Sequence, residues 1–221
     1  MISLRPIKAG EEVLNYYGPL PDSDLLRRYG YVSPKHEVHN VVEIAWGTVL
    51  SAVMQCCDLQ ESVLQQALAK LDEDELEDSF VLEYLSVSPD SAGNLPNIAV
   101  EFTEIPESML HQTKALMKRV AKLKPDVVFN DRTMLQVFCM AIDQRLSQYT
   151  TSLEEDRVRI DQLSRSRGFG ETQHDLAEGR RIMAIQVRLG EKVLLMKAKH
   201  HAQNCLDDTQ DQARTKRVRT S

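Results

Sequence analysis

The sequence has little aromatic content and no apolar run long enough to cross a membrane. Aromatic residues make up 5% of its 221 positions, with a single tryptophan. No window approaches the roughly 20 consecutive apolar residues that a transmembrane helix needs, and no basic N-terminal start leads into an apolar stretch. We therefore expect no membrane partner and a location in the nucleus, the cytoplasm or both.

Patterns typical of metal ligands are also missing. Two of the four cysteines, Cys56 and Cys57, are adjacent, which is a poor arrangement for two ligands of one metal. His200 and His201 are likewise neighbours that would face different sides of a helix, and no His-Glu-x-x-His pattern occurs. We predict buried thiols in a reducing compartment and no metal site.

The chain has no excess of positive charge. Its formal net charge is −6, from 33 acidic and 27 basic residues. Because binding to nucleic acid begins with the neutralisation of phosphates, this balance argues against direct nucleic-acid binding. A hydrophobic content of 42% is enough to bury one sizeable core. An enzyme or a protein-binding module fits this charge and this hydrophobic content better than a nucleic-acid-binding protein does.

One stretch, Gly10 to Gly18, has a pattern that suggests chemistry. It reads Gly-Glu-Glu-Val-Leu-Asn-Tyr-Tyr-Gly, and turn-forming residues separate it from Leu-Leu-Arg-Arg-Tyr-Gly-Tyr at 25–31. The turn allows the two Tyr-Gly pairs, with Tyr17 and Tyr29, to fold back onto one site. The second motif reads as a short helix that Gly30 ends.

The rest of the chain is predicted to be mainly helical. Val-Val-Glu-Ile at 41–44 is β-prone, and Phe80 to Val87 is a strand or a short irregular apolar piece. Thr151 or Ser152, with Glu154 or Glu155 three residues on, resembles a capping box between two long antiparallel helices. Apolar residues at helical spacing predict helices over 45–54, 62–71, 106–123, 131–149 and 180–205.

These motifs together resemble the Rubisco large-subunit methyltransferase family, whose members are SET-domain protein-lysine methyltransferases. Gly-Glu-Glu, an apolar residue and then Tyr-Gly is similar to the last motif of a SET domain. The segments 149–156 and 184–192 are similar to the helical substrate-binding domain that follows it. The resemblance implies a mainly α chain: the C-terminal fragment of an α+β SET domain at 1–34, then a helical substrate-binding domain at 40–205.

The resemblance also implies an activity, protein-lysine N-methylation. Tyr17 matches the catalytic tyrosine, which also contacts the cofactor S-adenosyl-L-methionine, and Tyr29 would line the channel for the substrate lysine. An aromatic at a helix end that closes a small core is an equal alternative for Tyr29. The Gly-x-Gly and Asn-His motifs that precede Gly-Glu-Glu in a SET domain are not present ahead of Gly10, so we expect an incomplete cofactor pocket and no activity from this chain alone. The alternative function is a non-catalytic helical protein-interaction module.

The expected partner is a basic protein. Within the family, residues near 10–32 are most similar to enzymes that modify a large-subunit ribosomal protein. Asp72 to Asp78 is acidic at six of seven positions, which indicates a solvated linker or, alternatively, an electrostatic binding site for a basic partner.

Residues 206–221 have no apolar residues at helical spacing and end in a group of basic residues. They are predicted to be a disordered tail that acts as a nuclear-import signal or only adds solubility.

Overall fold

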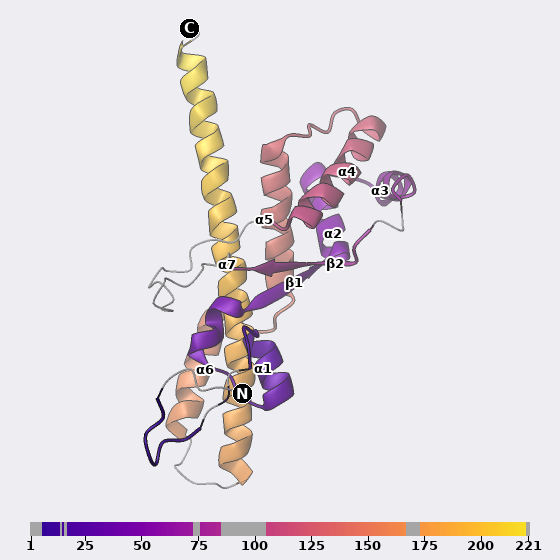
Figure 1. The fold of residues 1–221 in the computed structure, drawn as a ribbon. Helices are drawn as coiled ribbons and strands as arrows, with labels where there is room; N and C mark the ends of the chain where they lie inside the picture. Colours follow the sequence, from indigo (N-terminus) through magenta and orange to yellow (C-terminus); the bar gives the residue numbers. More distant parts are fainter. Residues whose placement is uncertain are drawn as a thin grey trace.

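A computed structural model of the chain shows an elongated, mainly helical molecule arranged along one long helix (Figure 1). The fold is mainly α, as predicted. Part of the acidic run and the end of the segment predicted at 80–87 fall outside the described residues. The structure describes residues 6–13, 15, 17–72, 76–84, 105–166 and 173–219.

Most of the elements are helices, and only two short strands are described among them. In chain order they are α1 (Asp22–Tyr29), the 3₁₀ helix η1 (Pro34–His39), β1 (Val41–Ala45), α2 (Trp46–Cys57), α3 (Glu61–Leu68), β2 (Ser79–Glu83), α4 (Glu107–Leu123), α5 (Asp131–Ser147), α6 (Leu153–Ser166) and α7 (Gln173–Arg219). Gly47 lies in the first turn of α2.

Helix α7 is the longest element, and α1, α5, α6 and both strands contact it. Its 47 residues correspond to a length of about 70 Å. Helices α5 and α6 follow one another along it, and both run in the direction opposite to α7 (Figure 1). The capped turn between α5 and α6 therefore joins two helices that run in the same direction, so the predicted antiparallel pair at this turn is wrong. Helix α7 is the antiparallel neighbour of both. The capping box at the start of α6 is formed by Ser152 and Glu155: each backbone N–H donates to the other's side chain, at 2.6 and 3.1 Å.

The backbone at 206–219 is helical, in the segment for which the sequence predicted a disordered tail. The helix ends at Arg219, well beyond Leu206, which is the last of the described side chains that packs against the core. Each residue added to an existing helix gains a hydrogen bond without a new nucleation cost. The alanine, glutamine, lysine and arginine residues of this segment also favour a helix, so helical structure continues where no apolar stripe remains.

The two strands form an antiparallel ribbon that is completed by helices. Val42 pairs with Leu82 and Ile44 pairs with Phe80, and all four side chains are buried on one face. A two-stranded ribbon is marginal by itself and needs such a cover. Helices α2, α4, α5 and the middle of α7 supply it, with buried residues that include Val49, Leu116, Met117, Ile142, Leu194 and Leu195.

No described helix combines the length and apolar character needed to cross a bilayer. Within the same residues, no group of three or more His, Cys, Asp or Glu side chains is placed to hold a metal ion. The four cysteines are free thiols, and burial raises the pKa of Cys56, Cys57 and Cys139.

Candidate functional site

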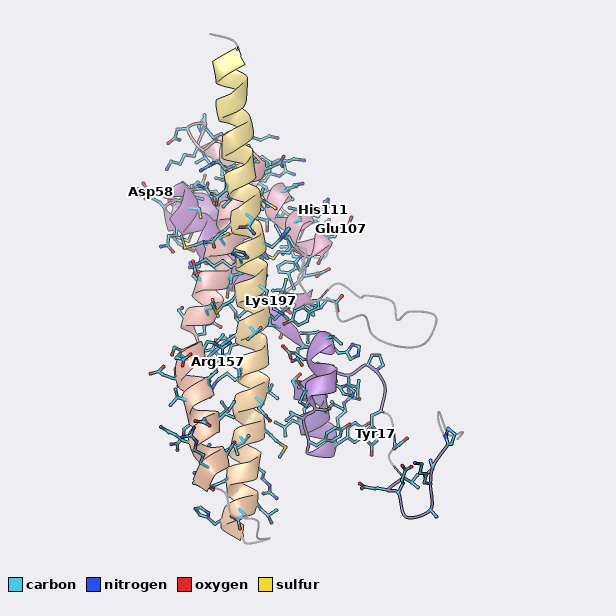
Figure 2. The ribbon with its side chains drawn as sticks, turned by 90° about the vertical axis from the view of Figure 1, so that its left-hand side faces the viewer. Tyr17, Asp58, Glu107, His111, Arg157 and Lys197 are labelled. Atoms are coloured by element: carbon cyan, nitrogen blue, oxygen red, sulfur yellow. The ribbon has the colours of Figure 1, made fainter. Side chains whose placement is uncertain are left out.

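Tyr17 and Tyr29 are in direct contact at the N-terminal side of the molecule. Their rings are stacked, with centroids 3.8 Å apart and planes at 21°. The Tyr31 ring is tilted against Tyr17 with a centroid distance of 6.3 Å. Figure 2 shows Tyr17 beside α1, on the side away from α7. The structure therefore brings together the two Tyr-Gly pairs that the motif spacing allowed to meet.

Each tyrosine is followed by a glycine that turns the chain. Gly18 and Gly30 have φ angles of 92° and 77°, a region that side chains other than glycine rarely adopt. The Gly30 N–H donates to the carbonyls of Leu25 and Leu26 and closes the last turn of α1. Gly30 therefore ends α1 as predicted.

Helix α1 is held at its N-terminus by Asn40, a residue from beyond η1. The Asn40 side-chain oxygen accepts from the Asp22 backbone N–H at 2.9 Å. The Asp22 carboxylate in turn accepts from the Asn40 amide at 3.3 Å and from the Ser33 N–H at 3.1 Å. Asp22 and Asn40 are both buried. Asp22 is thus the first residue of the helix, and the side chain that satisfies its N–H comes from a distant position.

Gly190 of α7 packs directly on Asn40. A Cβ atom at Gly190 would lie 2.6 Å from the Asn40 side-chain nitrogen, so a larger residue would displace it. Sequence reasoning did not assign a role to either residue. The available signal was a glycine inside a helical pattern, which often marks a close approach between elements.

The start of α6 is fixed to α7 by a buried ion pair. Asp156 and Lys192 are 1% and 2% exposed, and the Lys192 Nζ lies 2.6 Å from an Asp156 oxygen. Arg188 Nε and the Thr151 hydroxyl also donate to this carboxylate, at 3.0 and 2.8 Å. Burial opposes ionisation of Asp156, but the hydrogen bonds from Arg188, Lys192 and Thr151 outweigh it and lower its pKa to about 2.

A second polar group stabilises the same junction. The Tyr149 hydroxyl donates to a Glu191 oxygen at 2.5 Å, and the Arg145 guanidinium lies 4.6 Å from the centre of the Tyr149 ring. Burial and the hydrogen bond to Glu191 raise the pKa of Tyr149. The polar positions of the motifs at 149–156 and 184–192 therefore act as structural contacts between helices.

The residues around Tyr17 do not form a pocket for S-adenosyl-L-methionine by themselves. All described residues from Pro6 to Tyr17 are exposed. A Cβ atom on Gly10 or Gly18 would meet no atom within 4 Å. One face of the Tyr17 ring is covered by Tyr29. A cofactor of this size requires enclosing polar groups, which these residues do not supply.

Comparison with known proteins identifies the helical part. Residues 99–195 match the family described as Rubisco LSMT substrate-binding, where LSMT is the large-subunit methyltransferase. The match spans α4, α5, α6 and the first part of α7, while β1, α2 and α3 precede it and pack into the same core. The matched residues, fewer than half of the chain, therefore resemble the substrate-binding domain of this family, as the motifs at 149–156 and 184–192 predicted. The SET-like motif at 10–18 lies outside the matched residues.

A curated relative agrees with this result. Ribosomal lysine N-methyltransferase 4 of Saccharomyces cerevisiae is 32% identical over 68 residues. The aligned stretch covers 31% of this chain and 14% of the relative, so the chain spans only a small part of that protein.

Proposed function

We propose that this chain provides the substrate-holding part and the catalytic tyrosine of an S-adenosyl-L-methionine-dependent protein-lysine N-methyltransferase that acts on a lysine-rich ribosomal protein. The observation that carries the proposal is the stacked pair of Tyr17 and Tyr29, located where the SET-like motif joins the helical domain. The name of the yeast relative and the match at 99–195 support the same activity and substrate class.

In this proposal the tyrosine pair has two separate tasks. Lysine methylation requires a neutral amine held in line with the methyl donor. The Tyr17 hydroxyl would stabilise charge that develops at this amine. The ring centroids of Tyr17 and Tyr29 are 3.8 Å apart, which leaves no space for an amine between the rings. Tyr29 would therefore hold the Tyr17 ring from one face, while the lysine approaches from elsewhere.

The substrate would be attracted by charge. The chain has a net charge of −6, and ribosomal proteins are rich in lysine and arginine. The described carboxylates of the acidic run, Asp72, Glu77 and Asp78, are exposed. Complementary charges of this kind accelerate encounter and are screened by salt.

Methyl transfer tests the proposal directly. The assay uses S-adenosyl-L-methionine labelled in its methyl group, purified large ribosomal subunits, and a protein in which this chain completes a SET core. We expect label on one ribosomal protein, at lysine. Calorimetry of this chain alone with S-adenosyl-L-methionine should show no micromolar binding, because the described surroundings of Tyr17 are open.

The second candidate function is a non-catalytic protein-interaction module. It is favoured by the same open surroundings of Tyr17, which contain no enclosing pocket among the described residues. A chain that binds the basic protein but transfers no methyl group when it completes a SET core would support this alternative and contradict the enzyme.

A further inference from the structure

A cavity of about 330 Å³ lies between the segment after α1 and helix α7. Val32 and Pro34 line it on one side, and Leu189 and Val193 of α7 line it on the other. Two of these residues precede the matched range 99–195 and two lie inside it. The cavity therefore exists only where the SET-like segment packs on the substrate-binding domain.

The polar groups of the cavity favour a cation. Glu37 is exposed, and none of the described residues forms a hydrogen bond or ion pair with its carboxylate. The Asp22 carboxylate is held in place by Ser33 and Asn40. Arg157 is the cationic group among the lining residues, and its guanidinium lies 3.8 Å from Glu154 outside the cavity. The lining residues thus include two carboxylates and one guanidinium.

We infer that this cavity binds the side chain of a second basic residue of the protein substrate, separate from the lysine that is methylated. This inference rests on the proposed function. The apolar walls suit the aliphatic stem of a lysine or arginine, which covers apolar surface while its charged end stays near polar groups. Glu37 supplies the countercharge, and the side-chain oxygen of Gln186 is a further acceptor on the lining.

The cavity is close enough to the tyrosine pair for one peptide to reach both. Val32 adjoins Tyr31 in the chain, and the Tyr31 ring is 6.3 Å from that of Tyr17. Adjacent Cα atoms are about 3.8 Å apart, and an extended peptide advances about 3.3 Å per residue. The second basic residue is therefore expected within about six positions of the target lysine. Substrate choice would depend on two side chains.

The test uses the full chain and three labelled peptides, of which the first two have equal charge. The first probe is a twelve-residue peptide of alternating lysine and serine. In the second, ornithine replaces each lysine and shortens the stem by one methylene, and in the third every lysine is acetylated. Fluorescence anisotropy should show about fourfold tighter binding of the lysine peptide than of the ornithine peptide, the effect of one buried methylene. The acetylated peptide should not bind.

Two variants change the charge of the cavity, and a third variant is a matched control outside it. Glu37→Gln should weaken binding of the lysine peptide by about fivefold, the upper range for one partly exposed ion pair. Val193→Lys places a cation in the cavity and should abolish the preference for lysine over ornithine. Glu107→Gln makes the same charge change on α4, well away from Tyr17 and Arg157 (Figure 2), and should leave the affinity unchanged.

The outcomes separate this inference from the proposed function. If the parent binds the lysine and ornithine peptides with equal affinity, and Glu37→Gln binds the lysine peptide as tightly as the parent does, the cavity assignment is wrong while the proposed function stands. If the parent binds no peptide better than the acetylated one, both are wrong. If Nα-acetyl-lysine amide competes as well as the peptide, the ligand is a free cation and not a protein side chain. Methyl NMR shifts of Leu189 and Val193 in the parent locate the ligand even if Val193→Lys fails to fold.

Discussion

The side-chain nitrogen of Asn40 occupies the space that a Cβ atom of Gly190 would need, at a distance of 2.6 Å. Asn40 exchanges two hydrogen bonds with Asp22 at the first residue of α1. Tyr29 is the last residue of that helix. The packing of α7 on Asn40 therefore positions α1 and, through it, the stacked tyrosine pair.

Replacement of Gly190 by alanine tests this contact. Alanine normally stabilises a helix interior by about 1 kcal/mol relative to glycine. Here it would displace a buried amide and leave polar groups unsatisfied, which costs about 1–3 kcal/mol, so we expect a net loss of about 1 kcal/mol in the free energy of unfolding. Urea denaturation measures it. Gly47→Ala is the control, since a Cβ there meets nothing within 4 Å. A stabilised Gly190→Ala protein would show that Asn40 moves freely.

The buried carboxylate of Asp156 is predicted to be important for stability. Asp156→Asn leaves the buried ammonium of Lys192 without its countercharge and should cost about 3 kcal/mol. Asp161→Asn removes an exposed carboxylate that pairs with Arg165 on the same helix. This control should change stability by less than about 1 kcal/mol. Equal effects of the two changes in urea denaturation would contradict the importance of burial.

Asp156 should also make stability depend on acid pH. Its pKa is about 2 in the folded protein against an ordinary value of 3.8, so the unfolded chain binds the proton more readily. The contribution is therefore fully present above about pH 4 and is lost as the pH falls towards 2, with an amplitude on the order of 2 kcal/mol. The difference in stability between the parent and Asp156→Asn should shrink over this interval. A constant difference would mean that the carboxylate does not titrate there.

Tyr17→Phe tests the proposed catalytic role in a protein where this chain completes a SET core. Phenylalanine retains the ring that stacks on Tyr29 but lacks the hydroxyl. The turnover number should fall by a factor that corresponds to about 3 kcal/mol, while the Michaelis constant changes little, because the hydroxyl acts mainly in the transition state. Tyr31→Phe removes a hydroxyl nearby and should retain activity. Equal turnover of Tyr17→Phe and the parent would exclude Tyr17 from the mechanism.

The acidic run is predicted to affect encounter with a basic substrate. Replacement of Asp72, Glu73, Asp74 and Glu75 by serine should lower the association rate more than it raises the dissociation rate, since exposed charges act before contact. Surface plasmon resonance at low and high salt measures both rates. Exchange of aspartate for glutamate, and the reverse, at these four positions keeps the charge and should have no effect. If neither salt nor the serine changes matter, the run is a solvated linker.

Local patterns in the sequence were sufficient to predict several parts of the structure. Gly30 ends α1, and Ser152 with Glu155 caps α6. Such features depend on residues within five positions of one another, so they can be read along the chain. The helical period likewise predicted α5 closely. The helical period did not predict the helical backbone beyond Leu206, because helix extension from an existing helix does not need an apolar stripe.

The sequence by itself therefore determined a mainly helical chain with two Tyr-Gly pairs that are able to meet. Only the tertiary structure decided that the rings of Tyr17 and Tyr29 stack, that Asn40 fits against Gly190, and that Asp156 pairs with Lys192. The last two contacts join residues far apart in the chain, and no local period relates such positions. They arise because α7 lies along both the N-terminal segment and α6, and close packing leaves one arrangement in which these buried polar groups find partners.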